Sequence, residues 1–245
     1  MALKVEDNAL VHVSPDGRVL KRISLSTLFA EDPSYKRKLK EAYNELKSFE
    51  QNSSKGEVEV PRFDLFHANN IENLEWDIPG IAKKGDWLVT LRHLDRVIIV
   101  DSEREKIIWQ WGEGVIDKPH HATFLKEDQI LLFDNGVNKK FSRVIVLDMR
   151  SEKIVWQYGQ KSGQEFFTPK RGSVQRLPNG NTLISESDRG RVFEVTLSGE
   201  IVWEWYAEFS REEAGQGKRR IVPRMERLSY DFFKGIEFNY GKTKF

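Results

Sequence analysis

Short runs in which apolar and polar residues alternate make up most of the chain. RVIIVD (Arg96–Asp101), RVIVLD (Arg143–Asp148) and RVFEVT (191–196) are typical, and all three contain β-branched residues. A period of two residues with such side chains predicts β-strands. Turn sequences such as DNG (134–136) and PNG (178–180) separate the runs, as expected between strands. The pattern therefore predicts an all-β fold.

The strand pattern repeats along the sequence. KIIWQWG, KIVWQYG and EIVWEWY align, and their Trp residues at positions 109, 156 and 203 lie 47 residues apart each time. The units lack the helix-length amphipathic runs that a helical solenoid requires. Four short strands in a repeat of about 40 to 50 residues are typical of a β-propeller. We expect each Trp to pack between neighbouring blades, because aromatic side chains dominate such contacts.

The repeat divides the chain as one propeller domain over residues 1–245. The predicted parts are a half-blade at 7–24, a helical insertion at 25–50, blades at 63–112, 118–159 and 168–206, and a closing segment at 221–233. The insertion is predicted as a helix because strong helix formers replace β-branched residues there. We expect the closing segment to form an outer strand that pairs with the half-blade, which would remove a free sheet edge. The count gives about four blades, or a reduced or truncated form of a six-bladed ring.

Composition and charge exclude several classes of function. The chain has 245 residues, 39% of them hydrophobic, with 39 basic and 38 acidic side chains. This balance gives no overall field for nucleic acid, so an anion site must be a local cluster. The absence of Cys excludes disulfides and thiolate chemistry. No membrane span and no signal peptide are expected in this sequence, and it does not indicate an oligomeric state.

Polar residues at the starts of the predicted blades are the candidate chemistry. His67, His120 and Ser173 are 53 residues apart each time, and inner strands of a propeller converge on its central channel. Polar residues near these positions include Asn69, Arg92, His93, Asn135, Arg143 and Arg191. Guanidinium groups bind oxyanions with two hydrogen bonds, and His can transfer a proton or act as a nucleophile. The combination suits sulfate, phosphate or carboxylate.

Other kinds of site have less support from the sequence. A metal site of His residues with Asp134 is disfavoured, because neighbouring Arg side chains oppose a divalent cation. The sequence contains no GxGxxG, no GxxxxGK[ST] and no GxSxG, so no motif supports a nucleotide site or a serine hydrolase. We expect no metal and no cofactor.

Five segments together resemble the arylsulfotransferase (aryl-sulfate sulfotransferase, ASST) propeller family. They are FDLFHANNIE (63–72), WLVTLRHLDRVIIVD (87–101), HHATFLKEDQILLFDNG (120–136), FSRVIVLD (141–148) and TPKRGSVQRLPNGNTLISESDRGRVFEV (168–195). The resemblance covers roughly residues 7 to 230. It implies a periplasmic enzyme that moves a sulfuryl group between aryl sulfates and phenols without the nucleotide donor PAPS. It also implies a channel His that is transiently sulfated, with further His residues and an Arg around it.

The resemblance assigns roles to particular residues. By motif, His67, His120 and Arg143 match catalytic positions, and Asn69, Arg92, His93, Asn135, Arg191 and Arg224 are the candidates for substrate binding. The sequence departs from the family at its last motif, where GRVFEV places Arg191 at the position of the nucleophilic His. Arg stays protonated and cannot serve as that nucleophile.

Three functions therefore remain open from the sequence. The chain could be a sulfotransferase that uses His67 or His120 as its nucleophile. It could bind anionic aromatic ligands without turnover, with Arg191 strengthening the oxyanion pocket. It could also be a structural or interaction propeller.

Overall fold

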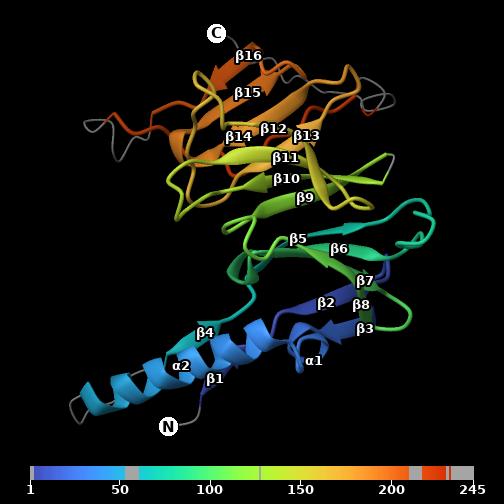
Figure 1. Cartoon of the computed structure of the whole chain (residues 1–245), viewed down its shortest axis with the longest axis vertical. Helices are drawn as coiled ribbons and strands as arrows, with labels where there is room; N and C mark the ends of the chain where they lie inside the picture. The colour runs from blue at the N-terminus through green and yellow to red at the C-terminus, as the bar shows by residue number, and fades with distance from the viewer. Residues whose placement is uncertain (1–2, 53–60, 127, 210–216, 230–231, 233–245) are drawn as a thin grey trace.

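A computed structural model describes residues 3–52, 61–126, 128–209, 217–229 and 232. Three consecutive four-stranded antiparallel sheets form the blades of a β-propeller fold (Figure 1). Blade 1 contains β5 (Ala68–Asn73), β6 (Trp87–Leu91), β7 (Arg96–Asp101) and β8 (Lys106–Trp111). Blade 2 contains β9 (His120–Leu125), β10 (Gln129–Asp134), β11 (Arg143–Asp148) and β12 (Lys153–Tyr158). Blade 3 contains β13 (Ser173–Arg176), β14 (Thr182–Glu186), β15 (Arg191–Val195) and β16 (Ile201–Tyr206).

A two-stranded half-blade precedes blade 1. It consists of β2 (Ala9–Val13) and β3 (Val19–Ser24), which pair antiparallel. Leu10 and Ile23 lie opposite each other in its ladder, and both are buried in a core shared with Trp87 and Val89 of blade 1. A short parallel pair, β1 (Lys4–Glu6) with β4 (Arg62–Asp64), lies beside the helical insertion. The all-β propeller prediction is therefore confirmed, with three full blades and one half-blade.

The middle strands of blades 1 and 2 are almost completely buried, which explains their nearly continuous apolar sequences. Every residue of β6 is buried, and β7, β10 and β11 are buried at all but one position. A strand buried on both faces becomes a nearly continuous hydrophobic run. In this fold those strands lie between neighbouring sheets, so both of their faces contribute to a core.

The repeated Trp residues do not all have the same environment. Trp109 packs in the core between blades 1 and 2, and Trp156 packs in the core between blades 2 and 3. The Trp156 indole also donates a hydrogen bond to the Leu197 carbonyl, 2.8 Å away. Trp203 is 38% exposed on β16. The prediction of packing between blades thus describes the first two, because β16 belongs to the last of the three blades.

The helical insertion contains α1 (Leu25–Leu28), α2 (Pro33–Asn52) and the turn between them. Ser24 caps α1, and the Asp32 carboxylate accepts hydrogen bonds from the first backbone N–H groups of α2. The face of α2 toward the propeller buries Tyr35, Ala42 and Leu46. Tyr43 of the same helix is 46% exposed.

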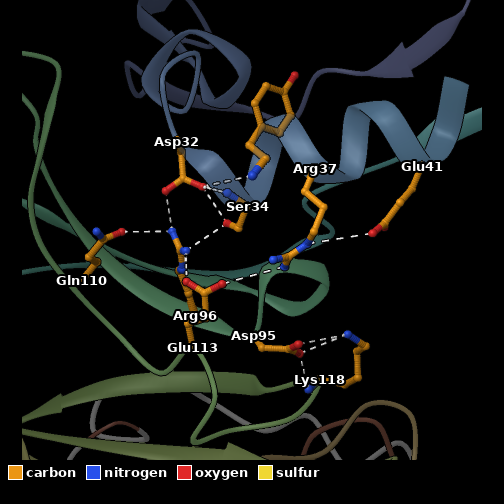
Figure 2. Close-up of polar contacts among 10 residues, drawn as sticks. Asp32, Ser34, Arg37, Glu41, Asp95, Arg96, Gln110, Glu113 and Lys118 are labelled. Atoms are coloured by element: carbon orange, nitrogen blue, oxygen red, sulfur yellow. Dashed lines mark hydrogen bonds and ion pairs between the residues drawn. The ribbon is translucent and has the colours of Figure 1, made fainter.

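One buried guanidinium joins α2 to blade 1 (Figure 2). Arg96 of β7 donates to the Asp32 carboxylate at 2.7 Å and to the Ser34 hydroxyl at 2.9 Å, and it also pairs with Glu113. Burial would by itself lower the pKa of Arg96, but the hydrogen bonds that it donates to the two carboxylates raise it. The contact is a buried charge with its partners in place, so the position of α2 depends on it.

The closing segment, of which residues 221–229 and 232 are described, packs on blade 3. Val222 and Met225 cover the apolar residues Leu177, Leu183 and Val192. The backbone N–H groups of Met225 and Arg227 donate to the side chains of Ser185 and Gln175. Within the described residues this segment forms no ladder with the half-blade, contrary to the expected pairing. The N–H groups of Met225 and Arg227 are instead bonded to side chains of blade 3. Residues 230, 231 and 233 of the segment lie outside the described part.

No helix in the described ranges is long and apolar enough to cross a membrane.

Candidate functional site

A cluster of His and Arg side chains lies where the inner strands of blades 1 and 2 begin. His67 lies between β4 and β5, Arg92 and His93 belong to a short 3-10 turn after β6, and His120 is the first residue of β9. The backbone N–H groups of Arg92 and His93 donate to the carbonyls of His67 and Phe66, at 3.2 and 2.9 Å. The two segments of blade 1 are thereby held side by side.

A second connection holds blade 1 against blade 2 at the cluster. Asp95, with φ of 54°, follows the 3-10 turn and accepts hydrogen bonds from the backbone and the ammonium group of Lys118, at 2.8 and 3.1 Å (Figure 2). Lys118 lies two residues before His120. The Asn69 amide also donates to the Pro119 carbonyl at 2.9 Å. These bonds explain how residues far apart in sequence meet.

The His67 ring is oriented by Asp64. Its Nδ1 lies 2.6 Å from one Asp64 carboxylate oxygen, and its backbone N–H donates to the other at 2.7 Å. A carboxylate can only accept, so Nδ1 carries the proton in this bond. The Nε2 atom is then the one available for chemistry.

His93 holds the Arg92 guanidinium. The Nδ1 atom of His93 donates to the Asp64 carbonyl at 2.7 Å, which leaves Nε2 to accept from Arg92 Nη1 at 2.9 Å. Burial is the main cause that lowers the pKa of His93, so this ring is neutral at neutral pH. Its centroid lies 4.8 Å from that of His67.

His120 is neutral for a similar reason. Its Nδ1 donates to Asn135 Oδ1 at 2.7 Å, while the Asn135 amide donates to the carbonyls of Thr168 and Arg171, at 2.7 Å each. Burial, with smaller contributions from the charges of Arg92 and His67, lowers the pKa of His120 to about 4. At neutral pH the ring therefore keeps a lone pair on Nε2.

Irregular backbone starts both inner strands. The β5–β6 ladder shifts register between Ala68 and Asn70, and the β9–β10 ladder shifts between Leu131 and Phe133, opposite His120. His67 and His121 adopt φ values of 49° and 44°. This left-handed conformation costs about 1 to 2 kcal/mol in a residue with a Cβ, and bulges re-aim side chains next to functional sites.

The arginines at the heads of the third strands have structural partners. Arg143 donates from Nε to the fully buried carboxylate of Asp134 at 2.7 Å and from Nη2 to the Val115 carbonyl at 2.8 Å. Arg191 lies between the fully buried Glu186, at 3.2 Å, and Glu204, at 2.5 Å.

These two residues and Arg96 each begin the third strand of a blade, and all three pair with carboxylates. Arg191 is thus the third copy of a repeated structural Arg. Its guanidinium is neutralised by two carboxylates, so the contacts of Arg143 and Arg191 favour structural roles.

A separate polar pocket of about 350 Å³ contains Arg224. It is also lined by His121 and Glu72. The Nδ1 atom of His121 accepts from the Val174 backbone at 3.2 Å, and burial lowers the pKa of His121 to about 4. Glu72 accepts from the Phe124 backbone at 2.9 Å, and burial raises its pKa. Arg224 is therefore placed with a different group of side chains from His120.

Sequence reasoning did not identify Asp64, Glu72 or the separate contacts of His121. The spacing Asp64-Leu65-Phe66-His67 could have indicated the contact, because an Asp carboxylate often accepts a hydrogen bond from a backbone N–H a few residues later in a turn. His121 directly follows His120 in the sequence. The bulge places these adjacent rings against different blades, with His120 bonded within blade 2 and His121 bonded to Val174 of blade 3.

Structure comparison finds several solved proteins that are partly similar to this chain. A protein of unknown function from Bacteroides caccae matches 82% of this chain at 11% identity, with a TM-score of 0.48. The Dos1 propeller matches 83% at 11% identity, also with a TM-score of 0.48. A catalytically inactive variant of virginiamycin B lyase from Staphylococcus aureus matches 82% at 13% identity, with a TM-score of 0.41. The chain covers 55%, 43% and 49% of those three chains, respectively.

Sequence comparison gives a more specific result. No curated protein matches the chain. The family model described as Arylsulfotransferase (ASST) matches residues 3–210, which include the half-blade, the helical insertion and all three blades. The chain therefore belongs to the arylsulfotransferase family.

Proposed function

We propose that this protein transfers a sulfuryl group from an aryl sulfate to a phenol without PAPS, and that His120 is the nucleophile. Membership of the arylsulfotransferase family supports the reaction class. The observation that carries the assignment is the state of His120: Asn135 binds its Nδ1–H, and burial keeps the ring neutral. A neutral imidazole with a lone pair on Nε2 is a competent nucleophile at neutral pH.

The first half of the reaction transfers the sulfuryl group to the enzyme. His120 Nε2 attacks the sulfur, a nitrogen–sulfur bond forms, and the bond between sulfur and the aryl oxygen breaks with its electron pair leaving on that oxygen. Protonated His67 donates its Nε2 proton to the departing phenolate. The Arg92 guanidinium provides hydrogen bonds to the sulfuryl oxygens, where bidentate geometry fits a tetrahedral oxyanion.

The second half regenerates the enzyme. Neutral His67 takes the proton of the acceptor phenol, whose oxygen attacks the sulfur. The nitrogen–sulfur bond breaks, and its electron pair returns to His120. His67 ends the cycle protonated, as it began, so protons and electrons balance without a cofactor.

This assignment changes the roles given to two arginines. Arg92, rather than Arg143, binds the sulfuryl oxygens, because Arg92 lies at the His cluster and Arg143 is paired with Asp134. Asn135 orients the nucleophile, and His93 orients Arg92. Asn69 lies beside the cluster, and its Oδ1 is buried without a hydrogen-bond partner in the described part of the chain. It is the candidate acceptor for a donor group of the substrate.

A transfer assay with matched variants tests the proposal. The protein is incubated with 4-nitrophenyl sulfate and a phenol acceptor, and nitrophenolate and aryl sulfate are measured. His120→Gln and Arg92→Met should each lower transfer by ~10²-fold or more, as expected when a nucleophile or an oxyanion donor is removed. His121→Gln is the control, because this adjacent, partly buried His is bonded to blade 3. Equal loss in the two His→Gln variants would contradict the assignment.

Binding without turnover is the second candidate function. The observation that favours it is Arg191, which occupies the place of the family's nucleophilic His. Thermal stabilisation by the aryl sulfate, lost in Arg92→Met and unaccompanied by transfer, would support it. An extracytoplasmic location, implied by the resemblance, belongs to the same proposal and would be checked by fractionating the native host.

A further inference from the structure

Asp64 contacts the candidate site through three of its atoms. Its two carboxylate oxygens accept the backbone N–H and the Nδ1–H of His67, at 2.7 and 2.6 Å, and its carbonyl accepts the Nδ1–H of His93 at 2.7 Å. Asp64 is the last residue of β4, which pairs in parallel with β1. The carboxylate is therefore attached to a strand on one side and to two site rings on the other.

The carboxylate fixes both the conformation and the tautomer of His67. The residue adopts φ of 49°, which a side chain with a Cβ disfavours, and the bond to its N–H compensates for that conformation. The second carboxylate oxygen requires a proton on Nδ1. Proton exchange with a substrate is thus confined to Nε2, the atom on the other side of the ring.

We propose that Asp64 is a positioning residue for His67, and that it lets this ring alternate between proton donor and proton acceptor at Nε2. The proposal rests on the proposed function for the identity of the proton donor. When His67 gives its Nε2 proton to the departing phenolate, the ring becomes neutral with its remaining proton on Nδ1, held by Asp64. Nε2 then carries the lone pair that removes the acceptor's proton in the second half of the cycle.

The substitution Asp64→Asn separates this role from a structural one. Asn keeps the size of the side chain and an oxygen that can accept the His67 backbone N–H. Its NH₂ group is a donor, so Nδ1 must become an acceptor and the neutral ring must carry its proton on Nε2. Such a ring has no lone pair on Nε2 for the acceptor phenol.

The test combines a structural readout with a kinetic one. Nitrogen-15 spectra of the His rings, assigned with a His67→Gln variant, report which nitrogen of His67 is protonated in the neutral ring. Transfer rates from 4-nitrophenyl sulfate are measured with a series of acceptor phenols that differ in acidity. Asp148→Asn is the matched control, because Asp148 accepts from the Ser151 backbone at 2.8 Å in the same three-residue spacing, away from the site.

The expected result is a change of the His67 proton from Nδ1 to Nε2 in Asp64→Asn only. For weakly acidic acceptor phenols the transfer rate should fall by ~10²-fold or more, as for loss of a general base, and by less for strongly acidic acceptors. An unchanged tautomer, or a rate loss equal for all acceptors, would overturn the role of Asp64. If the native protein transfers no sulfuryl group, the proposed function fails, and the tautomer measurement alone still decides whether Asp64 positions the ring.

Discussion

Replacing His120 by Gln should make the protein's stability less sensitive to acid. The folded pKa of His120 is lowered by burial, to about 4 from an ordinary value of 6.5. Between these values the unfolded chain binds a proton at this residue and the folded protein does not. Stability therefore falls as the pH drops through this window, and this contribution to the pH dependence is absent above it. Gln does not titrate, so the stability of the variant lacks this contribution to the pH dependence.

The size of the effect follows from the two pKa values. Linkage between a pKa of 6.5 in the unfolded chain and about 4 in the folded protein gives roughly 2 kcal/mol on acidification from about pH 7.5 to about pH 5. The wild-type protein should lose this amount in addition to whatever its other groups contribute. His121→Gln should produce a similar and separate reduction, because burial also lowers the pKa of His121 to about 4.

Urea unfolding at the two pH values measures the difference. Trp fluorescence reports the transition, and the free energy of unfolding is extrapolated to zero urea. For each protein, the loss in the free energy of unfolding on acidification is calculated. The loss in the variant is then subtracted from the loss in the wild type, so that the contributions of titrating groups common to both proteins cancel. A difference near zero would refute a neutral, buried His120 and, with it, the basis for its nucleophilicity.

Three further substitutions test the structural roles of particular residues. Arg96→Met should lower the free energy of unfolding by about 1.5 to 3 kcal/mol, because it removes the charge-assisted hydrogen bonds to Asp32 and Ser34. The exposed Arg37→Met should cost under ~0.5 kcal/mol, and equal effects in urea unfolding would contradict this. Gly136→Ala places a Cβ 1.8 Å from a backbone carbonyl oxygen at φ of 59°, so it should lower the free energy of unfolding by more than about 3 kcal/mol. Gly17 has open space around it, so Gly17→Ala should lower that free energy by only about 1 to 2 kcal/mol. Arg143→Met should destabilise by ~3 kcal/mol; a variant that keeps its melting temperature but loses transfer would show instead that Arg143 acts in catalysis.

Much of the fold follows from local pattern. The period-two runs predicted the strands, because apolar positions packed between blades must recur on defined faces. The 47-residue spacing of the Trp residues corresponds to the recurrence of the last strand of each blade, β8, β12 and β16. Helix formers around Lys38 indicated the insertion, but not its docking, which depends on Arg96 reaching Asp32 across 64 residues.

The position of the closing segment could not be predicted from the hydropathy pattern. Apolar residues such as Val222 and Met225 indicate that a segment must be covered, but not by which surface. Their choice of blade 3 depends on the shape of the patch around Leu183 and on side-chain acceptors such as Gln175. Neither is visible in a hydropathy pattern.

The site was predictable to the extent that it follows the repeat. His67 directly precedes β5 and His120 begins β9, so their approach could be expected from the propeller pattern. Arg143 looked equally suitable, since it begins an apolar strand. Its true partner emerges from ladder register, which places Asp134 directly across from it, just as Glu186 lies across from Arg191. An Arg can therefore be assigned to a site only after its cross-strand neighbours are known.

The central claim is that His120 carries the sulfuryl group between donor and acceptor. Its most direct test is mass spectrometry of the protein after brief exposure to an aryl sulfate without acceptor, under alkaline conditions that preserve a sulfated imidazole. We predict one sulfuryl adduct per chain, mapped by fragmentation to His120 and discharged by added phenol. An adduct on another residue, or turnover with no adduct on His120, would contradict the account.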